Sequence, residues 1–252
     1  MLLAIDAGNT NIVFALVDAG QIVARWRIAT DPRRTADEYA VWLNQLLQLE
    51  GHDRGVVDAV IIATVVPRAL HNLEVLASKY FGVDALVAGK GAVEWDIQLD
   101  VDEPGSVGAD RVVNAIAAHS LHGGDLIVVD FGTATTFDAV SPKGEYLGGA
   151  ITPGIEISLD ALFERAAGLR RVELVQPRNV IGRTTAESIQ SGALWGFAGQ
   201  VDGICRRFVA ELGECTVVAT GGLATVVSSY SEMITHHEPW LTLHGLRLVW
   251  ER

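Results

Sequence analysis

The chain has 252 residues, of which 49% are hydrophobic and 20% are charged, and its formal net charge is −12. This composition supports a packed core and excludes an intrinsically disordered chain, and the negative charge argues against nucleic-acid binding. No apolar run is long enough for a membrane span, and no basic signal-peptide segment opens the chain, so we expect a cytoplasmic protein with no membrane partner.

Residues 3–23 read LAIDAGNTNIVFALVDAGQIV. They predict a buried strand that ends at Asp6-Ala7-Gly8, then a small polar turn and two further strands. Glycine lets backbone N–H groups approach a ligand closely, which suits phosphate, and a carboxylate at a strand end suits Mg²⁺ that keeps much of its water. A plain hairpin turn is the alternative reading of one such motif.

Three more elements follow in the first half. Thr35 and Glu38 form a capping box for a helix, and residues 56–66 predict a buried strand that Pro67 stops. Apolar spacing predicts a helix over 109–121, opened by the residues GADR at 108–111. An aspartate at this position can simply cap the helix; alternatively, the adjacent acid and arginine are a base and an anion clamp.

Residues 127–147 read IVVDFGTATTFDAVSPKGEYL and repeat the pattern of the first segment. Asp130 aligns with Asp6 and Gly132 with Gly8, about half a chain length apart. Because two loops of this kind can hold a chain of phosphates from both sides, the repeat favours a nucleotide site over two ordinary turns. We expect two halves of one α/β architecture, joined near residue 118.

The second half continues with helix and strand signals. Thr184 and Glu187 form another capping box, which opens a long helix, and residues 216–220 predict a short buried strand. Gly221-Gly222 breaks that strand, and a flat ring or a ribose could approach the backbone there. Residues 243–250 are compatible with either a helix or a strand. Two cysteines, Cys205 and Cys215, are expected to be reduced thiols, because their spacing fits no redox pair or zinc site.

Five motifs together resemble those of type III pantothenate kinases. They occur in the family's order over nearly the whole chain: DAGNTN at 6–11, GADR at 108–111, DFGTATT at 130–136, GGAITPG at 148–154 and TGGLA at 220–224. The resemblance implies an α/β actin-like ATPase fold of two duplicated ribonuclease-H-like domains, residues 1–117 and 118–252, with a nucleotide cleft between them. It also implies ATP-dependent phosphorylation of the primary hydroxyl of pantothenate, the first step of coenzyme A synthesis.

The resemblance assigns roles to individual positions. Asp110 would be the general base. The ATP phosphates would be held by Asp6, Ala7, Gly8, Asn9, Thr10, Asn11, Ile12 and Val13, with Thr133 from the opposite loop. Pantothenate would be bound by Gly108, Ala109, Asp110, Arg111 and Thr185. Asp130 would hold a monovalent cation, K⁺ or NH₄⁺, and Asp6 would bind Mg²⁺ through water.

Members of this family are homodimers with the acceptor site near the dimer interface, so we expect a homodimer here. Two positions depart from the family's pattern. Ala7 stands where valine or isoleucine is common, and Val101 stands where many members carry a tyrosine that walls the pantothenate pocket. The second departure concerns the shape of the pocket and leaves the chemistry unchanged.

Three alternatives remain from the residues. A two-lobed aspartic protease also carries one Asp-x-Gly motif per half. It requires Thr or Ser after each aspartate, where this chain has Ala7 and Phe131. A non-catalytic, ATP-binding regulatory protein is disfavoured because Asp6, Asp110 and Asp130 are all present. The third is a kinase of the same fold that acts on another small acceptor.

Overall fold

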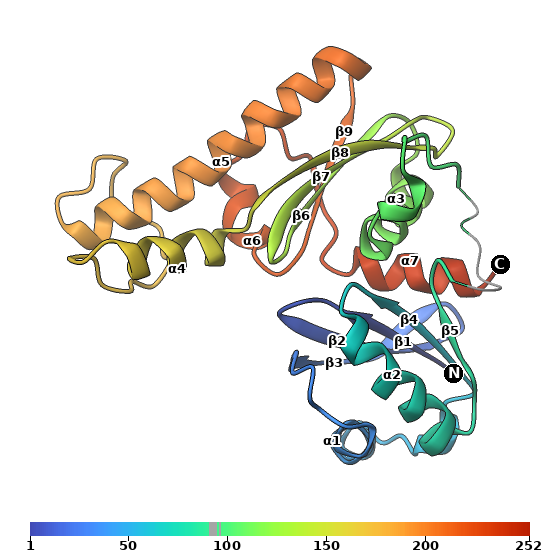
Figure 1. Cartoon of the computed structure of the whole chain (residues 1–252). Helices are drawn as coiled ribbons and strands as arrows, with labels where there is room; N and C mark the ends of the chain where they lie inside the picture. Colours follow the sequence, from blue (N-terminus) through green and yellow to red (C-terminus); the bar gives the residue numbers. More distant parts are fainter. Residues whose placement is uncertain (91–94, 96) are drawn as a thin grey trace. The chain divides into compact units, whose positions relative to one another are not determined.

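The computed structural model describes residues 1–90, 95 and 97–252 (Figure 1). The chain divides into two compact units. The first comprises Met1–Gln98, Glu103–Ala117 and Leu241–Arg252, and the second comprises Leu99–Asp102 and Ala118–Trp240. Each unit is built on its own five-stranded mixed sheet flanked by helices.

The sheet of the first unit has the strand order β3-β2-β1-β4-β5. Strand β1 pairs antiparallel with β2 and parallel with β4, β2 pairs antiparallel with β3, and β4 pairs parallel with β5. The bounds are β1 Leu2–Ala7, β2 Asn11–Asp18, β3 Gln21–Ala29, β4 Ala59–Thr64 and β5 Ala85–Val87. Strand β4 is shorter than the expected 56–66, because a 3₁₀ turn precedes it and a helix begins at Pro67.

The second sheet repeats this topology in the order β10-β9-β6-β7-β8. Strand β6 takes the place of β1: it pairs antiparallel with β7 and parallel with β9, while β8 extends the meander beyond β7. The bounds are β6 Leu126–Phe131, β7 Ala134–Val140, β8 Tyr146–Pro153, β9 Thr216–Thr220 and β10 His236–His237. The repeat read from the sequence is thus present as a shared topology.

The helices are α1 Ala36–Leu49, α2 Pro67–Leu76, α3 Ala109–His122, α4 Ile155–Arg165, α5 Thr185–Leu212, α6 Ala224–Val227 and α7 Leu241–Trp250, with shorter turns at Arg54–Val56, Ala77–Phe81, Pro104–Ser106 and Ser228–Tyr230. The capping box of α1 is confirmed, since Thr35 and Glu38 bond each other's backbone N–H groups. That of α5 is only half present. Thr184 accepts from the Glu187 N–H, but the Glu187 carboxylate accepts from Arg183 instead.

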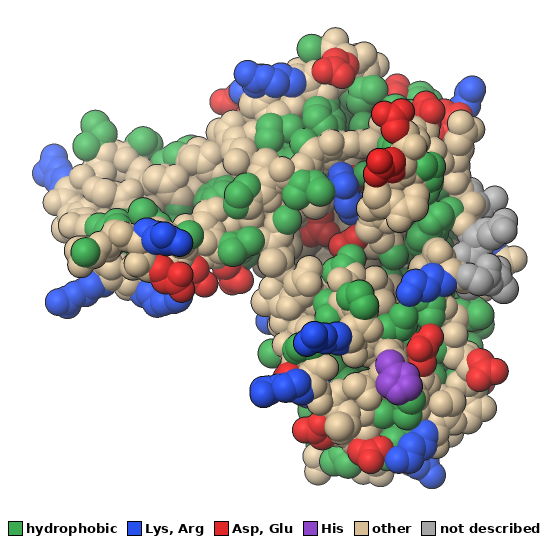
Figure 2. Space-filling view, in the orientation of Figure 1, with side chains coloured by type: hydrophobic (Ala, Val, Ile, Leu, Met, Phe, Trp, Pro, Cys, Tyr) green, Lys and Arg blue, Asp and Glu red, His purple; other side chains and the backbone are tan. Residues whose placement is uncertain are grey.

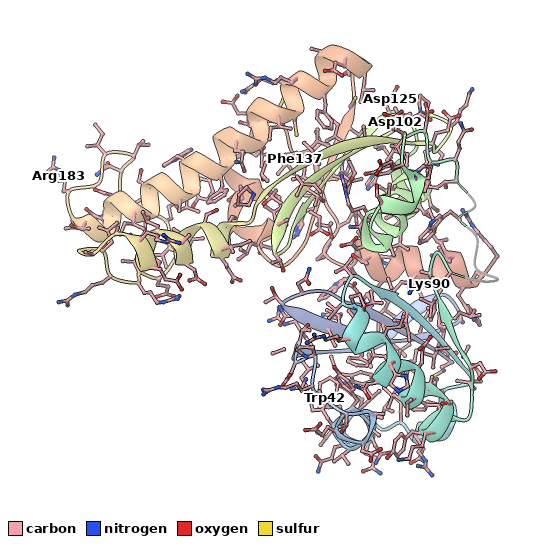
Figure 3. All side chains as sticks on the ribbon, in the orientation of Figure 1. Trp42, Lys90, Asp102, Asp125, Phe137 and Arg183 are labelled. Atoms are coloured by element: carbon pink, nitrogen blue, oxygen red, sulfur yellow. The ribbon has the colours of Figure 1, made fainter. Side chains whose placement is uncertain are left out.

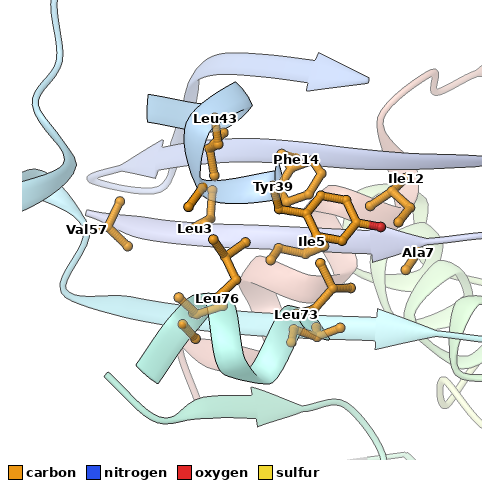
Figure 4. Close-up of a cluster of buried hydrophobic side chains, with 14 of the residues drawn as sticks. Leu3, Ile5, Ala7, Ile12, Phe14, Tyr39, Leu43, Val57, Leu73 and Leu76 are labelled. Carbon is orange, nitrogen blue, oxygen red and sulfur yellow. The ribbon is translucent and has the colours of Figure 1, made fainter. Parts of the chain in front are cut away.

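In the first unit, apolar side chains of β1 and β2 pack against α1 and α2 (Figure 4). Leu3, Ile5 and Phe14 are fully buried in this layer. Helix α7 covers the opposite face by packing on β1 and β4. A sheet covered on both faces explains why β1 is apolar at nearly every position before Asp6.

Residues 243–250, left open between helix and strand, lie in helix α7, with Leu243, Leu246 and Val249 buried three residues apart. Because α7 packs on the first sheet, the compact units do not coincide with the expected halves 1–117 and 118–252 at the C-terminal end. The change of unit within α3, between Ala117 and Ala118, does lie at the expected boundary. The division into two ATPase domains as such stays a prediction.

Candidate active site

The first of the two repeated loops is a four-residue turn, because Ala7 and Ile12 are the last paired residues of β1 and β2. Gly8 donates its N–H to the Asn11 carbonyl at 3.0 Å, so this amide closes the turn and is not available to a phosphate. The Thr30 hydroxyl donates to the Gly8 carbonyl at 2.7 Å and supports the loop from the end of β3. Sequence reasoning missed Thr30.

The side chains predicted at the ATP phosphates differ in their exposure. Ala7 and Ile12 are fully buried, so they could meet a ligand only through their backbone. Asn9 and Thr10 are exposed at the tip of the loop, and Asp6 is partly exposed. The part of this motif that can face a ligand is therefore the carboxylate and the polar tip.

The second repeated loop is one residue shorter than the first. Phe131 pairs with Thr135, and Gly132 donates its N–H to the Ala134 carbonyl at 3.0 Å. Asp130 pairs with Thr136 and is partly exposed, as Asp6 is in the first unit. Each unit thus ends its central strand with an accessible aspartate beside a closed turn.

Two glycines from motifs that are distant in the sequence pack closely against this second loop. The Gly154 N–H donates to the Thr133 carbonyl at 3.2 Å, and a Cβ on Gly154 would overlap that carbonyl. Gly221 has φ +92°, and a Cβ there would overlap the Asp130 carboxylate and the Phe131 backbone. The motifs DFGT, ITPG and TGG therefore meet at one end of the second sheet.

Gly108-Ala109-Asp110-Arg111 forms the beginning of α3. The Asp110 carboxylate accepts from the Arg111 N–H at 2.9 Å and lies over Gly108, where a Cβ would be 2.5 Å from an Asp110 oxygen. Burial raises the pKa of the Asp110 carboxyl, and the Arg111 N–H and charge partly oppose that shift. The motif thus places a partly desolvated carboxylate against a glycine.

Val65 links this motif to the first loop. Its N–H donates to the Ala7 carbonyl at 3.2 Å, and its side chain would lie 3.7 Å from a Cβ on Gly108. Asp6 and Asp110 therefore belong to neighbouring segments of the first unit. Val65 carries no chemical signal in the sequence, so only the structure reveals this role.

Thr185 lies apart from the other predicted site residues of its own unit. It is exposed in the first turn of α5, whereas α5 reaches the sheet near Gln200, which bonds Thr152. Fifteen helical residues span roughly 22 Å. The segment from Val180 to Trp195, which includes the first turns of α5, is called the arm below. Figure 3 labels Arg183 at the tip of this arm and Phe137 in the sheet. The structure does not bring Thr185 to Thr133 or Asp130.

A cavity of about 500 Å³ adjoins the second loop on two sides. Ile155 follows Gly154, and Leu223 follows the double glycine; both line it. Its wall is mainly apolar with a few charged groups: Ile155, Glu156, Leu159, Asp160, Phe163, Arg171, Val172, Glu173, Leu174 and Leu223. Four of these ten lining residues are charged, and a volume of this order can hold a small organic ligand.

Residues 2–207 match the family described as type III pantothenate kinase. The chain belongs to the type III pantothenate kinase family. It is 64% identical to the type III pantothenate kinase of Rhizorhabdus wittichii, covering 100% of this chain and 98% of that protein. It is 56% identical to that of Zymomonas mobilis, covering 100% and 93%.

Two solved structures show that the fold is wider than the family. The ethanolamine utilization protein EutJ from Carboxydothermus hydrogenoformans aligns with a TM-score of 0.55 at 17% identity, over 98% of this chain and 89% of that one. The activator of the 2-hydroxyisocaproyl-CoA dehydratase from Clostridium difficile, with bound ADPNP, aligns with a TM-score of 0.55 at 12% identity, over 99% and 96%. The expected actin-like ATPase fold is confirmed.

Membership of this family shows that the chain is an ATP-dependent enzyme of coenzyme A biosynthesis, which phosphorylates pantothenate. The aspartic protease alternative is wrong, and the regulatory protein and the kinase for another acceptor are set aside by the same finding. No helix among the described residues is long and apolar enough to cross a membrane.

Proposed function

We propose that Asp110 is the general base of this kinase. The observation that carries the proposal is the carboxylate's position over Gly108, partly desolvated and oriented by the Arg111 N–H at 2.9 Å. A carboxyl whose pKa is raised toward the working pH takes a proton more effectively in the transition state. The pantothenate hydroxyl oxygen would bond to the γ-phosphorus as the bond from that phosphorus to the β–γ bridging oxygen breaks, and Asp110 would accept the hydroxyl proton.

Arg111 stands next to the base and would hold the carboxylate of pantothenate. A guanidinium forms two parallel hydrogen bonds with a carboxylate, which fixes both distance and orientation. One short segment would then grip one end of the acceptor and activate the other. An uncharged amide of pantothenate should be a poor substrate, because it lacks the carboxylate that would accept both hydrogen bonds of the guanidinium.

The two repeated loops would hold the nucleotide. The first would contribute Asp6 through Val13, by the Asp6 carboxylate, the polar side chains at its tip and, at the buried Ala7 and Ile12, the backbone alone. The second would contribute Thr133. Gly222 is exposed, and a Cβ there would have nothing within 4 Å, so the ribose would approach the backbone at this position. The cavity between Ile155 and Leu223 begins next to the Thr133 loop and has the size and apolar wall for the base.

Asp6 and Asp130 would each supply one ligand to a cation, whose other ligands would come from outside the protein. Among the described residues no group of three or more His, Cys, Asp or Glu side chains could hold a metal. A carboxylate suits Mg²⁺ that keeps much of its water and binds the phosphates of ATP, so Asp6 would take that role. Asp130 would hold K⁺ or NH₄⁺. These cations would offset the charge of the transferring phosphoryl group.

We also propose that the enzyme is a cytoplasmic homodimer. The arm that carries Thr185 exposes apolar side chains: Val180 is 61%, Ile181 83% and Trp195 41% accessible. Figure 2 shows hydrophobic side chains on the surface of this part of the molecule. Surfaces of this kind favour a partner, and a second copy of this chain is the partner that we propose. The thiols of Cys205 and Cys215 are free, as expected in a reducing compartment.

Replacement of the base tests the central proposal. Asp110→Asn keeps the shape and the hydrogen-bond acceptor but cannot take a proton, so kcat should fall by roughly 10²-fold or more while ADP binding, measured by calorimetry, is unchanged. Glu103→Gln is the matched control, because it removes an exposed carboxylate shortly before the motif. Turnover of Asp110→Asn close to wild type in a folded variant would overturn the assignment.

A further inference from the structure

The chain that follows β3 is bonded to the first repeated loop. Antiparallel pairing places Ala29, the last residue of β3, opposite Asn11. The Thr30 N–H donates to the Thr10 carbonyl at 2.9 Å, and the Thr30 hydroxyl bonds the same loop. Residues 31–34 therefore start at the edge of the loop that we propose for the ATP phosphates.

Two adjacent arginines stand in this segment of an acidic chain, and their side chains make different contacts. Arg33 is bonded to Asp31: its backbone N–H and its Nε donate to one carboxylate oxygen at 2.9 and 3.3 Å, and its side chain is 89% exposed. Arg34 turns back toward β3, where its Nη1 donates to the Ala29 carbonyl at 2.9 Å. Because Ala29 is paired with a loop residue, this bond holds the Arg34 guanidinium beside the loop.

The Tyr39 ring is a second contact of the Arg34 guanidinium. The guanidinium carbon lies 5.5 Å from the ring centroid, within the range of a cation–π interaction. Tyr39 is fully buried, and Figure 4 shows its hydroxyl directed toward the strand ends at Ala7 and Ile12. Burial raises the pKa of this hydroxyl, and the neighbouring Arg34 charge opposes the shift. The guanidinium is thus fixed at the end of the sheet where the first loop begins.

Arg34 has hydrogen-bond donors beyond the one that it gives to the backbone. A guanidinium carries several N–H groups in a planar fork, and this residue is partly exposed. Two neighbouring carboxylates are bonded to other groups, Asp31 to Arg33 and Glu38 to the N–H and hydroxyl of Thr35. The Arg34 fork is therefore suited to an anion from outside the protein, and its geometry matches phosphate.

We propose that Arg34 binds a phosphate group of ATP beside the first loop, held there by the Ala29 carbonyl and the Tyr39 ring. The proposal rests on the proposed nucleotide role of that loop and adds a charged contact to it. Residues 6–13 contain no cationic side chain and the chain has a net charge of −12, so a local cation would offset the repulsion of ATP. Arg34 takes no part in binding the acceptor in this scheme.

Matched arginine variants test this contact. Arg34→Gln and Arg33→Gln each remove one positive charge from the same segment, but only the first removes the proposed phosphate contact. Calorimetry with Mg–ADPNP, a non-hydrolysable ATP analogue, should give a Kd raised about tenfold in Arg34→Gln and less than about twofold in Arg33→Gln. KM for pantothenate should stay within about twofold of wild type in both variants. Equal changes of Kd in the two variants, or an unchanged Kd in Arg34→Gln, would refute the proposal.

Two further measurements separate phosphate binding from a structural role and from failure of the proposed function. Without nucleotide, the thermal midpoint of Arg34→Gln should lie within about 2 °C of wild type, because exposed polar contacts contribute little to stability. A midpoint that falls together with affinity would show that Arg34 only supports the loop. Asn9→Ala removes a polar side chain at the loop tip. If it weakens ADPNP binding and Arg34→Gln does not, this inference alone fails; if neither does, the proposed nucleotide role of the loop fails.

Discussion

The two repeated loops share a strand, an aspartate and a closed turn, but the rest of the chain supports them by different means. In the first unit the loop is supported by polar contacts, such as the Thr30 hydroxyl on the Gly8 carbonyl. In the second, Gly154 and Gly221 lie against the loop with no room for a side chain. The duplicated hairpin is thus shared by the two units and visible in the sequence, whereas its supports are specific to each unit.

This contrast predicts very different losses of stability when a glycine at each loop is replaced by alanine. Gly221→Ala should destabilise the enzyme by more than about 3 kcal/mol, because its positive φ and the contact with Asp130 both exclude a Cβ. Gly8→Ala should cost about 1 kcal/mol or less, since its Cβ would lie 3.3 Å from the Asn11 carbonyl, at a φ that is not positive. Urea unfolding of both variants measures the difference; similar losses would contradict the comparison.

The two aspartates at the strand ends should differ in the cation that depends on them. Asp130→Asn should abolish activation by K⁺ or NH₄⁺ and lower activity in potassium by about tenfold, the order of one lost charge-assisted contact. Asp6→Asn should keep the K⁺ response but require more Mg²⁺. Activity titrated with each cation distinguishes the two. A wild-type enzyme that is equally fast in sodium would exclude the monovalent site.

The sequence predicted the parts of this site that carry their own signal. Asp6, Asp130 and the double glycine stand at strand ends, and strand ends can be read from apolar runs. The supports could not be predicted, because Thr30 and Val65 are ordinary residues whose roles depend on which backbone groups lie opposite them. Helix α7 was undecided for the same reason: ten mostly apolar residues fit either element until they have a sheet to pack on.

Removal of the Thr30 hydroxyl tests the polar support of the first loop. Thr30→Val should cost about 1 kcal/mol and raise KM for ATP a few-fold, because the Gly8 carbonyl loses a donor while the side chain keeps its shape. Thr152→Val is the control in the second unit, where the hydroxyl bonds the Thr135 carbonyl within paired strands rather than a loop residue. A larger rise of KM for ATP in Thr152→Val than in Thr30→Val would contradict the proposed role of Thr30.

The smallest effect that we predict is on the free energy of unfolding, which should rise when the Asp110 carboxylate is removed. Burial raises the folded-state pKa of Asp110, so the folded state binds a proton more readily than the unfolded state does. Stability from this group is therefore greatest at acidic pH and falls as pH rises from the unfolded pKa, near 3.8, through the raised folded value. At neutral pH the ionised carboxylate costs stability, and the first unit bears this cost for a competent base.

Asp110→Asn should therefore be the more stable protein at pH 7.5, by about 1 kcal/mol, although it is nearly inactive. The gain should shrink as pH is lowered, because wild-type Asp110 then becomes neutral as well. Urea unfolding at several pH values measures it, with Glu103→Gln as the control that removes an exposed charge. A variant that is less stable than wild type at neutral pH would mean that the Asp110 carboxylate is well solvated or firmly paired. In that case the contrast between a first unit that carries a partly desolvated base and a second unit that carries a cation ligand would lose its physical basis.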